Sequence, residues 1–219
     1  MTDILLPNRQ DTLNRASNIG HEWDFLMDTP DNLSIFERGE ATHSFGSGGL
    51  HLDAGSSEGD EVGIRLGIDS AYYPNYRRFT LSAICDHTRS TRWEDKAYFG
   101  IFGQHSDNKS GVGIVVSEEE FGGAIAGEIN SDGELETGDD DLSSFVRRDP
   151  LIIWMEYDGV ENTFEYAYSF SGGLDGGVVE GVSLGVANSR ATPMFVENIG
   201  FDSSTLGLRY LSVGFSPTR

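Results

Sequence analysis

Tyrosine and arginine side chains gather between residues 71 and 78 in a pattern that suits ligand recognition. Tyr72, Tyr73 and Tyr76 lie close together there, and two arginines follow them. A tyrosine ring offers a flat apolar face and a hydroxyl at low cost in side-chain entropy, which suits stacking on a sugar ring or anchoring a protein interface. Trp93, in a later connection, would add a second platform. The alternative is that these rings fold back over a sheet edge, because a chain with 37% hydrophobic residues needs its aromatic side chains as core.

Acidic side chains are the other candidates for chemistry. Hydrolysis of a glycosidic bond needs two carboxyl groups with different pKa values, one as proton donor and one as nucleophile or base. Glu128 begins the most suggestive run, but Asn130 follows it, and Asp132 with Gly133 is typical of a turn. We therefore expect the strand to end before a second acid can face Glu128, and the sequence predicts no active carboxylate pair.

The acids beyond this turn are interpreted as a solvated loop. Calcium is the one cofactor considered for it, because carboxylates on a flexible segment supply hard oxygen ligands. The spacing differs from that of an EF-hand, and the five histidines are scattered without metal-ligand spacing, so no metal site is predicted. The loop residues are Glu134, Glu136, Asp139, Asp140 and Asp141.

Short alternating runs are the elements that must position these residues. From residue 62 to 68, apolar side chains alternate with Gly63, Arg65 and Gly67, which predicts a strand with one buried and one open face. The run 79–86 alternates as well, and its single cysteine, Cys85, is expected to be a small buried side chain. Further strands are predicted at 98–102, 111–116, 124–129, 151–157, 163–170, 178–184, 194–201 and 207–215.

These runs predict an all-β fold, an antiparallel two-sheet β-sandwich of jelly-roll type. Ten strands with almost no helical spacing between them favour two sheets packed face to face. We assign residues 21–219 to one sandwich domain. Residues 1–20 lack strand texture and are assigned to an N-terminal arm.

Several segments resemble concanavalin A-like lectins, glucanases and laminin-G-type domains. The hairpin of residues 154–159 and 162–164 resembles their central hairpin, and residues 98–101 followed by 111–115 are similar in kind. The closing residues 211–216 resemble the last strand of legume lectins. This resemblance implies the jelly-roll fold rather than a function.

Glycoside hydrolases of this fold carry a strand motif of Glu, any residue, Asp, two residues and Glu. The nearest match is the segment 128–134, in which Asn130 stands at the position of the Asp. The resemblance therefore implies a protein that is not an enzyme.

Charge is the strongest global signal. Asp and Glu number 36 against 15 Lys and Arg, and the net charge is −21. Nucleic acid is excluded as a partner, since phosphate binding needs a basic surface. Lysine occurs only at Lys96 and Lys109, and such acidity with so little lysine resembles the proteins of salt-loving organisms. No apolar run is long enough to span a membrane.

The arm carries one apolar patch, Ile4, Leu5 and Leu6, which is expected to dock the protein onto a partner. Our main hypothesis is a non-enzymatic structural or accessory virion protein, decorating a capsid, turret or tail of a virus of a halophilic host. Its partners would be further copies of the chain or other virion proteins. The alternative is a stand-alone carbohydrate-binding, lectin-like module, extracellular or cytoplasmic in a halophile, that recognises a cell-surface glycan. A glycoside hydrolase is the second alternative.

Overall fold

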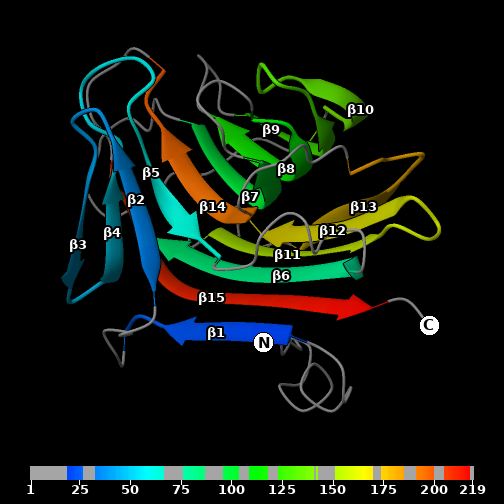
Figure 1. Cartoon of the computed structure of the whole chain (residues 1–219), viewed down its shortest axis with the longest axis horizontal. Coiled ribbons are helices and arrows are strands. Elements are labelled where there is room, and N and C mark those ends of the chain that lie inside the picture. The colour runs from blue at the N-terminus through cyan, green and yellow to red at the C-terminus, as the bar shows by residue number, and fades with distance from the viewer. Residues whose placement is uncertain are drawn as a thin grey trace.

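The computed structural model describes residues 19–26, 33–66, 76–86, 96–103, 109–117, 123–140, 142, 151–169, 174–184, 191–199 and 205–217. Within these residues the chain forms strands and turns without a helix, and so without any helix that is long and apolar enough to cross a membrane. The strands form two antiparallel sheets that stack as a sandwich (Figure 1). The predicted all-β, two-sheet class is confirmed.

The first sheet has eight strands. Along its path the order is β13, β12, β11, β6, β15, β4, β3, and β1 also pairs with β15. All of these pairings are antiparallel. The bounds are β13 (Asp175–Glu180), β12 (Thr163–Ser169), β11 (Leu151–Asp158), β6 (Tyr76–Asp86), β15 (Thr205–Pro217), β4 (Gly49–Asp53), β3 (Thr42–Gly46) and β1 (Ile19–Asp24).

The second sheet has seven strands, in the order β10, β9, β8, β7, β14, β5, β2. Every neighbouring pair is antiparallel here too. The bounds are β10 (Leu135–Asp139), β9 (Gly123–Ile129), β8 (Gly111–Ser117), β7 (Lys96–Gly103), β14 (Ala191–Glu197), β5 (Glu61–Arg65) and β2 (Ser34–Arg38).

The main hydrophobic core lies between the sheets and follows the period of two. In β6 the side chains of Phe79, Leu81, Ala83 and Cys85 are all buried in it, as their alternation predicts. Burial raises the pKa of the Cys85 thiol, so this side chain is an inert core residue and not a reactive one.

The predicted hairpin is confirmed as β11 and β12. Its turn begins at Asp158, whose carboxylate accepts hydrogen bonds from the N–H of Val160 at 2.8 Å and of Glu161 at 3.3 Å. Arg78 of the neighbouring β6 also donates to this carboxylate, at 2.7 Å. Burial alone would raise the pKa of Asp158, but these donors outweigh it and hold the pKa below its usual value. Asn162 closes the turn with a φ of 54°, a left-handed conformation that asparagine tolerates.

Several elements differ from the sequence-based expectation. The acidic stretch interpreted as a loop contains a strand, β10, which pairs with β9. The strand expected at 178–184 begins earlier, at Asp175, and ends at Glu180, because Gly181 turns the chain with a φ of 78°. Strands β1, β2, β3 and β4 were not predicted, since their short sequences lack runs of branched or aromatic residues, and β1 begins at Ile19, within the residues assigned to the arm.

The strand expected to have one open face is β5, and this expectation is wrong. Glu61, Val62, Gly63 and Ile64 are all buried. The reason is that the face of the seven-stranded sheet that points away from the core carries a second buried layer, described below.

Strand β13 is the last described strand along the path of the eight-stranded sheet, and among the described strands it pairs only with β12. Val178 is 61% exposed on it, and the residue just before the strand, Leu174, is 66% exposed. Acidic residues stand at its two ends, Asp175 and Glu180. This strand is therefore an exposed edge framed by carboxylates.

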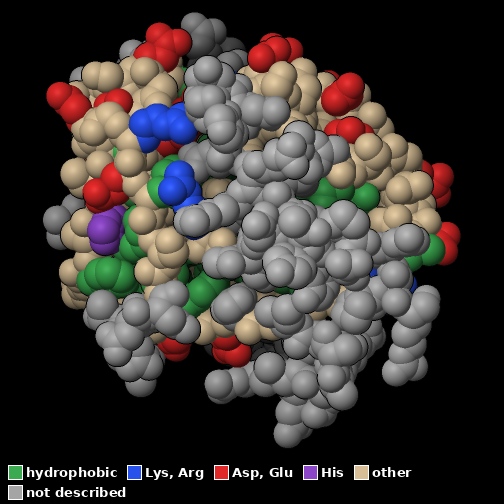
Figure 2. Space-filling model, in the orientation of Figure 1, with side chains coloured by type: hydrophobic (Ala, Val, Ile, Leu, Met, Phe, Trp, Pro, Cys, Tyr) green, Lys and Arg blue, Asp and Glu red, His purple; other side chains and the backbone are tan. Residues whose placement is uncertain are grey.

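The acid excess predicts that salt stabilises the fold. Acidic side chains lie around the rim of the face seen in Figure 2, whereas basic side chains are few and gather over β2 and β5. The resulting self-repulsion of a chain with net charge −21 is screened to a range of roughly 3 Å in 1 M salt. We expect the melting temperature, followed by circular dichroism, to rise steadily from dilute buffer to multimolar KCl. A flat or falling curve would contradict this expectation.

Candidate functional site

The outer face of the seven-stranded sheet carries a compact aromatic cluster. Tyr98 and Phe102 of β7 and Phe195 of β14 alternate with core residues, so their side chains point away from the other sheet. The rings of Tyr98 and Phe195 stack at 4.1 Å with an interplanar angle of 5°, and Phe102 meets both edge-on. All three side chains are at most 1% exposed, so this face is a second core.

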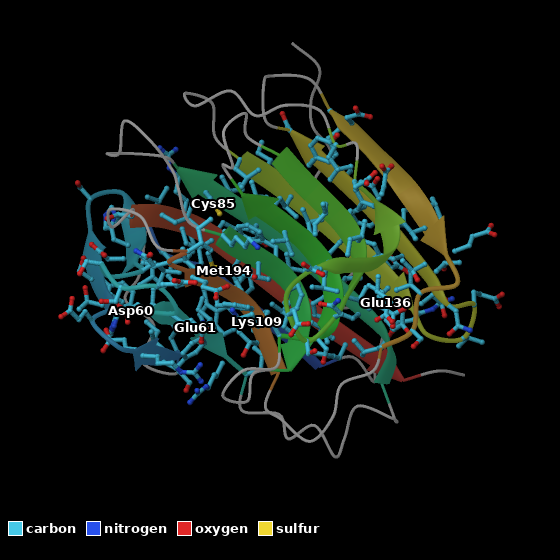
Figure 3. The ribbon with its side chains drawn as sticks, turned by 90° about the horizontal axis from the view of Figure 1, so that it is seen from above. Asp60, Glu61, Cys85, Lys109, Glu136 and Met194 are labelled. Carbon is cyan, nitrogen blue, oxygen red and sulfur yellow. The ribbon has the colours of Figure 1, made fainter. Side chains whose placement is uncertain are left out.

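An ion cluster borders the aromatic cluster on the same face. Glu61 of β5 and Glu197 of β14 lie directly opposite each other in register. The ammonium of Lys109 bridges the two carboxylates, in close contact with Glu197 and 3.9 Å from Glu61. Arg38 also pairs with Glu61, at 3.2 Å. In Figure 3 Glu61 and Lys109 lie next to each other, far from Glu136 of the acidic strand β10.

The ion cluster and the aromatic cluster share a hydrogen bond. The hydroxyl of Tyr98 donates to Oε2 of Glu197 at 3.0 Å. Burial, and next the negative charge of Glu197, raise the pKa of Tyr98 far above its usual value, so the hydroxyl remains a donor.

A turn covers this hydroxyl. Gly133 has a φ of 80°, and a Cβ there would lie 2.7 Å from the Tyr98 oxygen. The backbone N–H of Lys109 donates to the carbonyl of Ser131 in the same turn, at 3.2 Å. The described part of this face is therefore closed by its own chain, and its charges neutralise one another.

An open pocket lies instead on the outer face of the eight-stranded sheet, across β15, β4 and β3. These three strands are neighbours at one end of that sheet. Its volume is about 610 Å³, within the roughly 300–1,000 Å³ of small-molecule sites. The polar residues that line it include Thr42, Ser44, His51, Asp53, Thr205 and Arg209.

Side chains along a strand alternate between the two faces of a sheet, and this alternation explains why the pocket residues meet. Leu50 and Leu52 of β4 enter the core, so His51 and Asp53 between and after them face outward. Register places Thr42 of β3 opposite Asp53, and Asp53 opposite Thr205 of β15. A hydroxyl, a carboxylate and a second hydroxyl are therefore aligned across three neighbouring strands.

Hydrogen bonds fix the Asp53 carboxylate. Its Oδ1 accepts from the N–H of Gly55 at 3.0 Å, and its Oδ2 accepts from the hydroxyl of Thr205 at 3.4 Å. The two hydrogen bonds thus orient the carboxylate and leave further lone pairs for a ligand.

A β-bulge directs Arg209 to the pocket. The pairing of β15 with β6 shifts register between Leu208 and Tyr210, so that Arg209 is the extra residue. Bulges of this kind re-aim a side chain next to binding sites. Gly49 of β4 makes the bulge possible, because its φ is 106° and a Cβ there would lie 2.4 Å from the Leu208 carbonyl oxygen.

The turn between β3 and β4 forms the pocket rim. Gly46 and Gly48 lie along the imidazole of His51, and a Cβ on either would approach the ring to 3.2 Å. Ser47 lines the pocket between these glycines. His43 also lines the pocket, and its ring lies against Glu37 of the other sheet, with Nδ1 and Oε1 2.7 Å apart.

Most of the sequence-predicted site residues lie outside the described residues. This is so for Tyr72, Tyr73 and Trp93, and also for the arm residues Ile4, Leu5 and Leu6. Tyr76 starts β6, where its backbone pairs with Pro217, and its side chain is not described.

The strand that carries Glu128 ends where the sequence predicts. β9 ends at Ile129, and the amide oxygen of Asn130 accepts hydrogen bonds from the N–H groups of Asp132 and Glu134, at 2.9 and 3.0 Å. Asn130 therefore closes a turn. Glu128 accepts a hydrogen bond from the backbone N–H of Ser183 at 2.9 Å, so it belongs to the wall of the sandwich.

Metal ligands do not converge in the described part of the acidic stretch. Asp139 of β10 accepts a hydrogen bond from the hydroxyl of Tyr166 at 3.1 Å and thereby ties the edges of the two sheets together. Burial, and then this carboxylate, raise the pKa of Tyr166. Among all described residues, His, Cys, Asp and Glu nowhere form a group of three able to hold a metal ion.

The pocket residues were missed by reasoning from the sequence. A signal was present, because polar side chains recur at every second position in Thr42 and Ser44 and again in His51 and Asp53. Such alternation around the glycine-rich turn 46–49 is typical of a hairpin with a polar outer face.

This architecture is the fold of the legume lectins. Peanut lectin superposes with a TM-score of 0.65 at 12% identity, covering 93% of this chain and 100% of its own. The carbohydrate recognition domain of Emp46p, in a metal-free form, gives 0.51 at 11% identity, covering 87% and 93%.

A protein of unknown function from Shewanella oneidensis gives a TM-score of 0.70 at 11% identity, covering 100% of this chain and 98% of its own. No family profile matches the sequence, and no curated protein matches it either. At these identities the likeness shows the fold alone.

Proposed function

We propose that the protein is a non-catalytic carbohydrate-binding module of lectin type, whose partner is a cell-surface glycan and whose sugar site is the pocket on β3, β4 and β15. The observation that carries the proposal is the pocket wall, in which hydroxyls, an imidazole, a carboxylate and a guanidinium converge from three strands. Sugar hydroxyls are recognised by such convergent donors and acceptors on a rigid frame. The lectin-like fold supports the same class of ligand.

The pocket favours binding over hydrolysis. Glycoside hydrolysis uses a pair of carboxyl groups, whereas among the described residues that line the pocket Asp53 is the single acid. One main support of the virion interpretation was the apolar patch of the arm, which lies outside the described residues, and the interpretation gains no support from the lectin structures.

The test is a glycan array followed by calorimetric titration of the best glycan with the full-length chain. We expect Asp53→Asn to weaken binding about tenfold or more, because a hydrogen bond to a charged group contributes about 1.5–3 kcal/mol. The matched control is Glu156→Gln, which removes an acid from β11 of the same sheet away from the pocket. Absence of any bound glycan, or equal affinities for Asp53→Asn and the parent, would refute the proposed site.

A further inference from the structure

We infer that the pocket selects a sugar that bears a carboxylate, a hexuronate or a sialate, through Arg209. This inference rests on the proposed function and names its ligand class. The overall charge of the chain sets a condition for any anionic ligand. The chain has 36 acidic against 15 basic residues, so an anionic ligand is repelled by most of the molecule and needs a local cation.

The pocket supplies that cation. Arg209 is the arginine among the lining residues, and the bulge in β15 holds its backbone in place. A guanidinium matches a carboxylate with two parallel hydrogen bonds, a geometry that a neutral hydroxyl cannot reproduce.

Most of the other polar lining groups can donate a hydrogen bond to a ligand oxygen as well as accept one. Thr42, Ser44 and Ser47 contribute hydroxyls and His51 contributes an imidazole. The one acid, Asp53, already accepts a hydrogen bond on each of its oxygens. The hydroxyls and the imidazole can donate to the oxygens of a sugar, and the positive charge of Arg209 favours a carboxylate over a cationic group.

The volume is compatible with a sugar of this size. About 610 Å³ accommodates a ring together with its carboxylate and leaves room for a neighbouring residue of an oligosaccharide. The carboxylate would lie at the β15 side, on Arg209, and the ring hydroxyls at the β3 and β4 side.

Two matched ligand pairs test the inference by calorimetric titration of the full-length chain. The first pair is oligogalacturonate and its methyl ester, and the second is sialyllactose and lactose. We expect the acidic member of at least one pair to bind about tenfold or more tightly than its neutral partner. A sulfated galactan of similar length tests whether any anion suffices, and we expect it to bind more weakly than the carboxylated sugar.

Two substitutions assign the effect to Arg209. Arg209→Gln should remove the preference for the acidic member, and Arg209→Lys should leave an intermediate preference, because it keeps the charge but loses the planar fork. The matched control is Arg78→Gln on β6 of the same sheet, where the arginine pairs with Asp158 instead of lining the pocket. This control should leave the preference unchanged. Arg209→Lys also keeps the test valid if Arg209→Gln folds poorly.

The outcomes separate this inference from the proposed function. Equal binding of acidic and neutral members, tightest binding of the sulfated galactan, or a preference that survives Arg209→Gln overturns the carboxylate inference. The inference also fails if the glycan array yields only neutral sugars, while the carbohydrate-binding proposal then stands. Absence of binding to every glycan on the array overturns both.

Discussion

Replacing Lys109 by methionine is expected to lower the free energy of unfolding by about 3–5 kcal/mol, the loss typical of breaking a buried ion pair from one side. Lys109 is 18% exposed, and its two partners, Glu61 and Glu197, are 2% and 9% exposed. Without the ammonium, Glu197 keeps the hydrogen bond from the Tyr98 hydroxyl, and Glu61 keeps its ion pair with Arg38. A buried carboxylate that has lost its cation costs several kcal/mol. Urea unfolding measured at equal m-values gives the difference.

The control is Lys96→Met on β7. Lys96 lies opposite Glu197 in register, but it contributes no ion pair to the cluster that we describe, so this change should cost much less. A double variant, Lys109→Met with Glu197→Gln, should recover part of the loss, because a neutral amide replaces the unpaired charge. If Lys109→Met costs no more than Lys96→Met, the cluster is solvated and the outer face is open.

Truncating Phe195 to alanine is expected to cost about 3–5 kcal/mol, as for a fully buried aromatic residue in a main core. Phe195 is 0% exposed, stacks on Tyr98 and meets Phe102 edge-on. Removal would leave a cavity between these two rings and abolish both contacts. The midpoint of urea unfolding should fall accordingly.

The comparison variant is Ile152→Ala on β11, a half-buried residue on the outer face of the eight-stranded sheet. It should cost clearly less, because its site is partly solvated before truncation. Similar losses for the two variants would show that the two outer faces are equally exposed, contrary to the structure.

Strands with a strict apolar alternation were predictable from the sequence. The core residues of β6 follow from its alternating sequence, because only one face of the strand meets the core. The β11–β12 hairpin follows from Asp158, whose side chain bonds the backbone of the turn itself. The second buried layer was not predictable in this way. In β7 and β8 apolar residues and glycines occupy both faces, so the period of two carries no information about which face is open.

The candidate site depends on contacts that are distant in the sequence. Thr205 and Asp53 are 152 residues apart and meet only because β15 pairs with β4. Lys109 and Glu197 are 88 residues apart and meet across the outer face. A sequence pattern identifies which residues face outward within a strand, but strand order decides which outward residues become neighbours.

The exposed edge at β13 has a consequence for self-association. Two copies that pair their β13 edges antiparallel about Gly177 and Val178 would place Asp175 of each opposite Glu180 of the other. Like charges directly opposite each other destabilise a strand pair, so the carboxylates oppose the sheet-to-sheet joining that an exposed edge otherwise invites. Screening weakens this repulsion as ionic strength increases. Salt that weakens the charge repulsion within one molecule therefore also weakens the repulsion between the β13 edges of two molecules.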